Sequence, residues 1–205
     1  MKFYTLWLAL ICIIMFIVQL IFPGFTDALV LNQASWFEPW RFVSSIFLHG
    51  GIGHLLYNLL ALVMFGLVLE KFVGEKKFLL VFFVSGIIAN LIAINFYPSS
   101  LGASGAIMGI IGALALIKPN LMVWAIGVPM PLFLASIFWV FGDIAGIFIP
   151  DGVGNIAHLA GVGVGLLFGI IFRFKKKQAD SSYEYTRVVR IPEPYMRNWE
   201  DENIK

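Results

Sequence analysis

The chain reads Leu101-Gly102-Ala103-Ser104-Gly105-Ala106-Ile107-Met108-Gly109 where a hydrophobic segment begins that reaches about Ile117. Ser99 and Ser100 stand before this segment as good N-caps, and Pro98 ends whatever precedes them. Ser104 is therefore expected in the first turn of a helix, near backbone N–H groups that lack an intrahelical partner. Such a position suits an oxyanion. The competing interpretation is that the hydroxyl bonds back to its own helix and only aids packing.

The composition is that of a membrane protein. Hydrophobic residues make up 60% of the chain, charged residues 13%, and the mean hydropathy is +0.91, against about 25% charged residues in a soluble domain. A membrane-spanning helix needs about 20 mostly apolar residues. Six segments qualify, at about 4–22, 53–69, 78–97, 101–117, 121–149 and 153–172. The sequence thus predicts an all-α, polytopic bundle of six transmembrane helices over residues 1–177 and a flexible polar cytoplasmic tail over 178–205.

The basic residues predict the orientation in the membrane. If the six segments alternate, one side is flanked by Lys2, Lys71, Lys76, Lys77, Lys118, Arg173, Lys175, Lys176 and Lys177. The opposite loops hold one cation, Arg41, beside Asp27, Glu38 and Asp151. By the positive-inside rule, both termini are expected to be cytoplasmic. We expect the first segment to be retained, because no small-residue cleavage site follows it.

Several polar and aromatic positions give local expectations. The loop 25–52 is too apolar for a solvated linker, and its aromatic residues Trp36, Phe37, Trp40 and Phe42 suit the headgroup level of a membrane. Glu70 and the lysines after it are expected to be solvated flanks. Asn90 and Asn95 are expected to form hydrogen bonds between helices. Pro129 and Pro131 should break the fifth segment, so that its membrane part is about 131–149.

Three polar side chains from three segments are predicted to reach one level below the outer surface. Ser104 lies roughly five residues into its segment, or ~7 Å deep, and His158 lies ~8 Å deep in its own. Asn58 falls at a similar depth and shares a helix face with His54, four residues earlier. His49, among glycines before this helix, is expected to order the loop.

Glycine faces can bring two of these segments together. Gly105 and Gly109 form one such face, and Gly161, Gly165 and Gly169 form another. On closely packed helices, His158 could take the proton of the Ser104 hydroxyl and later protonate a leaving amine. His54, Asn58 and the Ser104 backbone N–H could hold a developing oxyanion.

With these motifs the chain resembles the rhomboid intramembrane serine proteases in their basic six-helix bacterial form. The matching pieces are Trp40-Arg41, His49-x4-His54-x3-Asn58, Glu70-x3-Gly74, Gly102-Ala103-Ser104-Gly105 and Ala157-His158-Leu159-Ala160-Gly161. They follow the order of the family. One departure is Met108, which stands where many members carry an aromatic residue under the histidine ring. Another is a somewhat long linker between the last two segments.

The resemblance implies a specific site and activity. It implies a Ser104–His158 catalytic dyad, an oxyanion site from His54, Asn58 and the Ser104 amide, and supporting glycines at Gly102 and Gly105. It implies cleavage within or beside the transmembrane helix of a membrane-protein substrate, near the outer face of a bilayer. It requires no cofactor, no metal and no nucleic acid, and it places the chain in a cell membrane, with a bacterial cytoplasmic membrane expected.

Other functions are disfavoured by the residues present. A catalytically inactive rhomboid-like protein that only binds membrane clients would need neither Ser104 nor His158, yet both are there. A small transporter is disfavoured because the polar residues lie near the outer face and no inverted repeat is visible. A metalloprotease would need ligands that the sequence lacks, and the single Cys12 excludes an intramolecular disulfide and a cysteine-based metal site.

Asp143 is the carboxylate that lies well inside a predicted span. It is about six residues from the outer end of its segment, ~9 Å deep and near the level of His158, so a Ser-His-Asp triad is one interpretation. The resemblance implies a dyad without an acid, and burial of an isolated carboxylate is costly. We therefore expect Asp143 to be a structural hydrogen bonder between helices, tolerant of replacement by Asn.

Overall fold

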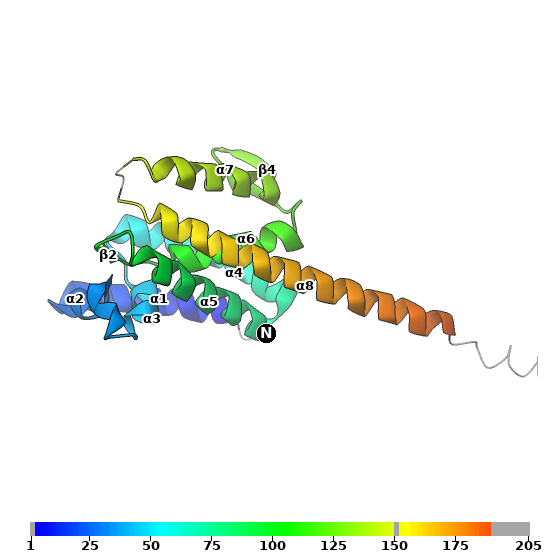
Figure 1. Ribbon diagram of the computed structural model, residues 1–205, viewed down its shortest axis with the longest axis horizontal. Coiled ribbons are helices and arrows are strands. Elements are labelled where there is room, and N and C mark those ends of the chain that lie inside the picture. Colours follow the sequence, from blue (N-terminus) through cyan, green and yellow to red (C-terminus); the bar gives the residue numbers. More distant parts are fainter. Residues whose placement is uncertain (1–2, 150–151, 190–205) are drawn as a thin grey trace, which may run out of the picture. The chain divides into compact units, whose positions relative to one another are not determined.

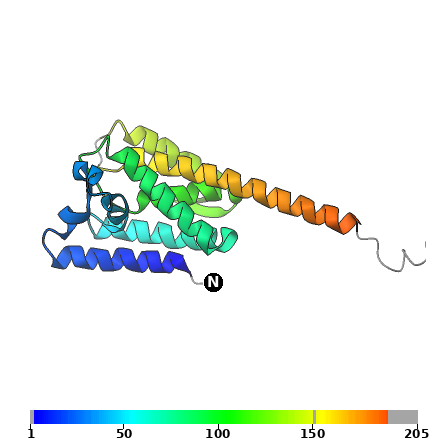
Figure 2. The same ribbon diagram turned by 60° about the horizontal axis from the view of Figure 1, so that its bottom comes forward.

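The computed structural model describes the chain over residues 3–149 and 152–189, with side chains as far as residue 173. The chain divides into a first compact unit, Met1–Ile170, and a second unit, Ile171–Lys205. Figures 1 and 2 show the first unit as a bundle of helices.

The long helices of the bundle are apolar, as expected where backbone groups must be satisfied without water. They are α1 (Tyr4–Ile21), α4 (Ile52–Val73), α5 (Glu75–Ala93), α6 (Ser104–Ile117), α7 (Leu132–Gly146) and α8 (Asn155–Val189). Four are long and apolar enough to cross a membrane, namely α1, α4, α5 and the Asn155–Arg173 part of α8. The helical membrane fold is confirmed at this level. The crossing of the shorter helices α6 and α7, and with it the six-span count, stays a prediction. Short strands lie in the connections between α1 and α4, between α5 and α6, and between α6 and α7.

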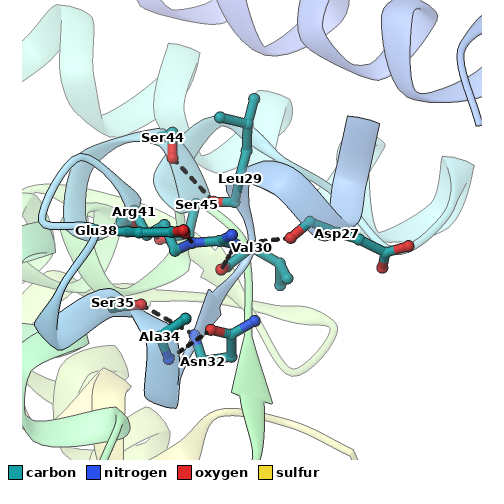
Figure 3. Close-up of polar contacts among 10 residues, drawn as sticks. All are labelled: Asp27, Leu29, Val30, Asn32, Ala34, Ser35, Glu38, Arg41, Ser44 and Ser45. Carbon is teal, nitrogen blue, oxygen red and sulfur yellow. Dashed lines mark hydrogen bonds and ion pairs between the residues drawn. The ribbon is translucent and has the colours of Figure 1, made fainter. Parts of the chain in front are cut away.

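The loop between α1 and α4 is a folded structure around Arg41. It contains α2 (Phe25–Leu29), β1 (Leu31–Asn32), η1 (Gln33–Trp36), α3 (Arg41–Ser44) and η2 (Ser45–Phe47). The Arg41 side chain is buried and donates hydrogen bonds to the backbone carbonyls of Asp27 (2.7 Å) and Val30 (2.9 Å), and it pairs with the Glu38 carboxylate (Figure 3). One guanidinium therefore satisfies several loop acceptors at once.

The expectation of four interfacial aromatic residues in this loop is wrong for one of them. Trp36, Phe37 and Trp40 are exposed, Phe37 by 90%. Phe42 is buried in a core cluster with Leu31 and Ala89. Position 42 faces inward because it lies on α3, which contacts α5.

Asn90 of α5 and Asn95 of the turn after it behave differently. Asn90 Nδ2 donates to the Phe42 carbonyl (2.9 Å) and to Ser45 Oγ (3.0 Å), and so joins α5 to the folded loop. Asn95 is exposed and donates to the Leu91 carbonyl of the preceding turn. A hydrogen bond between helices is therefore the wrong prediction for Asn95, because its side chain reaches its own turn first.

The helix that carries Ser104 begins later than expected. Ser99–Ser100 forms the strand β2, which pairs antiparallel with β1, so neither serine is an N-cap. The N-cap residue is Ala103, and Ser104 is the first residue of α6. The predicted place of Ser104 in the opening turn is confirmed. The predicted depth of Ser104 does not apply, because it was counted along a helix from residue 101 and residues 101–103 are not helical.

The predicted fifth segment starts as a β-hairpin. Strands β3 (Met122–Ala125) and β4 (Val128–Pro131) pair antiparallel, and Ile126 and Gly127 form the turn with positive φ. Residues 121–130 are therefore not part of a span, since the two prolines of β4 exclude a helix interior. Helix α7 begins immediately after them at Leu132. The turn before α8 includes residues 150–151, which lie outside the described residues.

Helices α6 and α8 pack backbone to backbone through the predicted glycine faces. A Cβ added at Gly161 would overlap the Gly105 carbonyl, and one added at Gly165 would overlap the Gly109 carbonyl. A Cβ at Gly112 would lie 2.6 Å from the Val162 carbonyl. Side chains at these positions would force the helices apart, so the small residues set the distance between them.

Glu70 is not a solvated flank. It is fully buried on α4 and accepts hydrogen bonds from the backbone N–H groups of Tyr4 (2.7 Å) and Thr5 (3.0 Å) and from Thr5 Oγ1 (2.7 Å). The two N–H groups belong to the first turn of α1, where backbone N–H groups have no partner within their own helix. Glu70 thus caps α1 from α4, and its charge is compensated by the helix dipole.

The described part of the predicted polar tail is helical. Helix α8 continues to Val189, so the backbone of residues 178–189 belongs to it. No glycine or proline interrupts residues 170–191, and charged residues do not by themselves end a helix. Residues 190–205, the rest of the predicted flexible tail, lie outside the described residues.

Replacement of Glu70 by Gln should lower the free energy of unfolding by ~1–3 kcal/mol, because an amide N–H would then face the N–H donors of α1. Thermal unfolding of the purified protein in detergent measures this loss. Lys71→Gln is the control, because Lys71 is exposed in the same turn. Equal stability of the two variants would contradict the capping role.

Candidate active site

The side chains singled out in the sequence converge on one cavity of about 1790 Å³ in the first unit. It lies among α4, α6, α7, the start of α8 and the segment before α6. The predicted site residues His54, Asn58, Gly102, Ser104, Gly105 and His158 all line it, and so does Asp143. The structure therefore brings together every residue that the sequence assigned to the site, from three separate parts of the chain.

Ser104 occupies the start of α6, on the wall of this cavity. Within the described part of the chain its hydroxyl forms no hydrogen bond to backbone or side chain, so the back-bonded interpretation does not hold. The neighbouring Gly105 lies close to α8, because a Cβ there would be 3.6 Å from the Ala157 carbonyl. The hydroxyl thus faces the cavity beside the turn that carries His158.

His158 lies in the first turns of α8. Its backbone N–H donates to the Gly154 carbonyl (2.9 Å), and its side chain is 15% exposed. Its Nδ1 atom is 2.8 Å from Asp143 Oδ1 on α7. No hydrogen bond joins His158 to Ser104 within the described residues. Such contacts are often long in a free enzyme and shorten with substrate bound.

The other side of the serine is formed by His54, Asn58 and Gly102. His54 Nδ1 accepts a hydrogen bond from the Gly50 N–H (3.4 Å), which leaves Nε2 as the N–H donor of a neutral ring. Asn58 is buried, and Nδ2 donates to the His54 carbonyl (2.9 Å), so its second amide N–H is available. Both donors line the cavity that Ser104 faces.

Gly102 has a position that a larger residue could not take. Its φ is +124°, and a Cβ built there would lie 2.8 Å from His54 Nε2 and 3.9 Å from Ser104 Oγ. The glycine therefore lets the His54 ring and the serine hydroxyl approach the same point. Its N–H is held by the Ser45 carbonyl (2.9 Å), which fixes this segment to the folded loop.

His49 supports the site from behind. It is 2% exposed, and neither ring nitrogen has a hydrogen-bond partner among the described residues. Its ring contacts that of His54 edge to face, with centroids 5.2 Å apart. Burial and the nearby His54 lower the pKa of His49 to about 4, so it is neutral at pH 7. The backbone of His49 exchanges hydrogen bonds with the Gln19 side chain, and these bonds order the loop.

These groups together fit acyl transfer. The Ser104 hydroxyl lies at a helix N-terminus and can act as a nucleophile, the His158 imidazole can act as a base, and the His54 and Asn58 N–H groups can bind an anion. The contact that motif reasoning did not select is that of Asp143 with His158. The sequence indicates it only through the similar depth of the two residues in their segments. A similar depth does not predict that the two side chains are in contact.

Comparisons with known proteins show what the chain is similar to. Residues 36–175 match the model of the Rhomboid domain. The chain is 31% identical to RHOMBOID-like protein 4 of Arabidopsis thaliana over 65% of this chain and 34% of that protein. It is 34% identical to the rhomboid protease GluP of Bacillus subtilis over 68% of this chain and 26% of that protein. It is 33% identical to the putative rhomboid protease YdcA of Bacillus subtilis over 69% of this chain and 71% of that protein. The matched region covers about a third of the Arabidopsis relative.

Gly102→Ala should slow the labelling of Ser104 by a fluorophosphonate by ~10²-fold, because the added Cβ would displace the His54 ring and strain the backbone. Labelling rates are read by mass spectrometry of the modified peptide. Gly53→Ala is the matched control, since a Cβ there meets nothing within 4 Å. Similar labelling rates in both variants would contradict this tight approach.

Proposed function

The chain belongs to the rhomboid family, and from that premise we propose that it is an intramembrane serine endopeptidase that cleaves transmembrane segments of membrane-protein substrates. The observation that carries the proposal is the convergence of Ser104, His158, His54 and Asn58 on one cavity of an apolar helical bundle. The bundle supplies the membrane setting, and the cavity supplies a nucleophile, a base and anion-binding donors.

In the proposed reaction, Ser104 Oγ attacks the scissile carbonyl carbon while His158 Nε2 takes its proton. The carbonyl oxygen becomes an oxyanion that accepts hydrogen bonds from His54, Asn58 and the Ser104 backbone N–H. The C–N bond then breaks, and the leaving amine takes the proton from His158. Water, deprotonated by His158, hydrolyses the acyl-serine and regenerates the hydroxyl.

The basic flanks support an orientation with both termini in the cytoplasm and the site near the outer face. In that orientation Ser104 reaches the outer end of a substrate helix, which must unwind to expose a peptide bond. A multi-pass location in a bacterial cytoplasmic membrane is part of the same proposal. Cleavage requires neither a metal nor a cofactor.

A second candidate is a catalytically inactive, client-binding member of the family. It is kept because some relatives carry the name RHOMBOID-like without the word protease. The presence of both Ser104 and His158 on the cavity favours the protease. Reaction of Ser104 with a fluorophosphonate separates the two, because an inactive protein would not activate the serine.

Ser104→Ala and His158→Ala should each abolish cleavage of a model single-span substrate by the purified protein in detergent. The double variant should be no worse, because the nucleophile and its base act as a unit. Product formation is followed on gels. Clear residual activity in either single variant, with the protein folded, would refute the dyad.

Asn58→Ala should lower turnover of the same substrate by ~10–10³-fold, because it removes an oxyanion donor and leaves the nucleophile in place. Asn95→Ala is the matched control, since that amide is exposed and bonds its own helix. An unchanged rate for Asn58→Ala would assign Asn58 to helix packing alone.

A further inference from the structure

The carboxylate of Asp143 faces the base of the proposed site. Its side chain is 10% exposed, that of His158 is 15% exposed, and Oδ1 lies 2.8 Å from Nδ1. The expected hydrogen bond between helices is therefore present. The partner of Asp143 in this bond is the imidazole of His158. A buried carboxylate needs such a partner, since an unpaired one is costly to keep from water.

The packing of α7 against α8 fixes this contact. Gly146 lies one turn after Asp143 on α7, and Asn155 lies one turn before His158 on α8. A Cβ at Gly146 would lie 2.5 Å from Asn155 Nδ2, so the two helices approach closely there. The antiparallel register that places Gly146 beside Asn155 also places Asp143 beside His158. The packing of the helix pair thus brings the two residues side by side.

We infer that Asp143 is a positioning residue for His158: its carboxylate accepts a hydrogen bond from Nδ1–H, which holds the ring as the tautomer whose Nε2 lone pair is free for the Ser104 hydroxyl. The inference rests on the proposed function, because it gives Asp143 its role through the base of that reaction. A carboxylate acceptor at Nδ1 is the general means of fixing a histidine tautomer in serine hydrolases. Once Nε2 has taken the serine proton, the same carboxylate pairs with the imidazolium.

The residue one helical turn after Ser104 is poorly suited to set a tautomer. Met108 lines the cavity there, and a thioether is a flexible contact and only a weak acceptor. A ring held by Met108 alone would be free to turn or to change tautomer. Asp143 removes that freedom with one directional bond.

Asp143→Asn tests the inference, because Asn is isosteric and its amide can donate to Nδ1, which favours the tautomer protonated at Nε2. We expect kcat/KM on the single-span substrate to fall by ~10²–10⁴-fold, mostly in kcat, with KM little changed. Ser136→Ala is the matched control, since this serine of α7 donates to the Leu132 carbonyl of its own helix and has no other hydrogen bond among the described residues. A loss within threefold for Asp143→Asn would overturn the inference.

The tautomer itself is measured by ¹⁵N NMR of histidine-labelled protein in micelles, with the His158 signal assigned by its absence in His158→Ala. Wild type should show Nδ1–H, and Asp143→Asn should show Nε2–H. An Nε2–H signal in wild type, or a loss of activity without a change of tautomer, would overturn the inference. The wild-type spectrum decides the matter if the variant does not fold.

The two proposals fail in different ways. If wild-type protein labels or cleaves without dependence on Ser104, the proposed function fails. The NMR measurement needs no cleavage and still tests whether Asp143 sets the tautomer. If cleavage depends on Ser104 and His158 but the Asp143→Asn spectrum and rate match wild type, the protease stands and the positioning role is refuted.

Discussion

Direct backbone contact between α6 and α8 is the constraint on which the site depends. Gly161 and Gly165 of α8 lie so close to the carbonyls of Gly105 and Gly109 that no side chain fits between them. The other flank of α6 is equally tight, since a Cβ at Gly105 would lie 2.6 Å from Ala89 Cβ of α5. The hydrophobic effect does not drive helices together within lipid, so close van der Waals packing has to stabilise their association. That packing places the helix start that carries the serine beside the turn that carries His158.

Around this centre, buried polar groups connect elements that apolar packing would leave in several arrangements. Glu70 ties α4 to the first turn of α1, Arg41 folds the outer loop, and Asn90 joins that loop to α5. Each bonds mainly to backbone groups. These bonds offset the free-energy cost of burying a polar group without a hydrogen-bond partner. Because Ser45 accepts from Gly102 and from Asn90, the loop also holds the segment that leads to Ser104.

The sequence predicts the helices and the site better than the environment of single side chains. Hydropathy places the apolar helices, and glycine spacing predicts the α6–α8 contact, because both depend on patterns over many residues. The burial of Glu70 and the local bond of Asn95 depend on what one side chain meets across the bundle, which no pattern encodes. The β3–β4 hairpin is missed for a similar reason: its residues are as apolar as a span, and only pairing between the strands distinguishes them. Motifs identify Ser104, His158, His54 and Asn58, yet they carry no information on which atom orients the imidazole.

Helix register places a carboxylate beside the imidazole. His158 is on α8, which the glycine face fixes against α6, while Asp143 is on α7, whose position depends on Gly146 beside Asn155. Two contacts of α8, one with each neighbour, therefore place the imidazole beside the Asp143 carboxylate and on the cavity that Ser104 also lines. A motif that lists only a serine and a histidine describes half of this arrangement. The other half lies in α7, where the buried Asp143 carboxylate has the His158 ring as its hydrogen-bond partner and so avoids the cost of an unpaired charge.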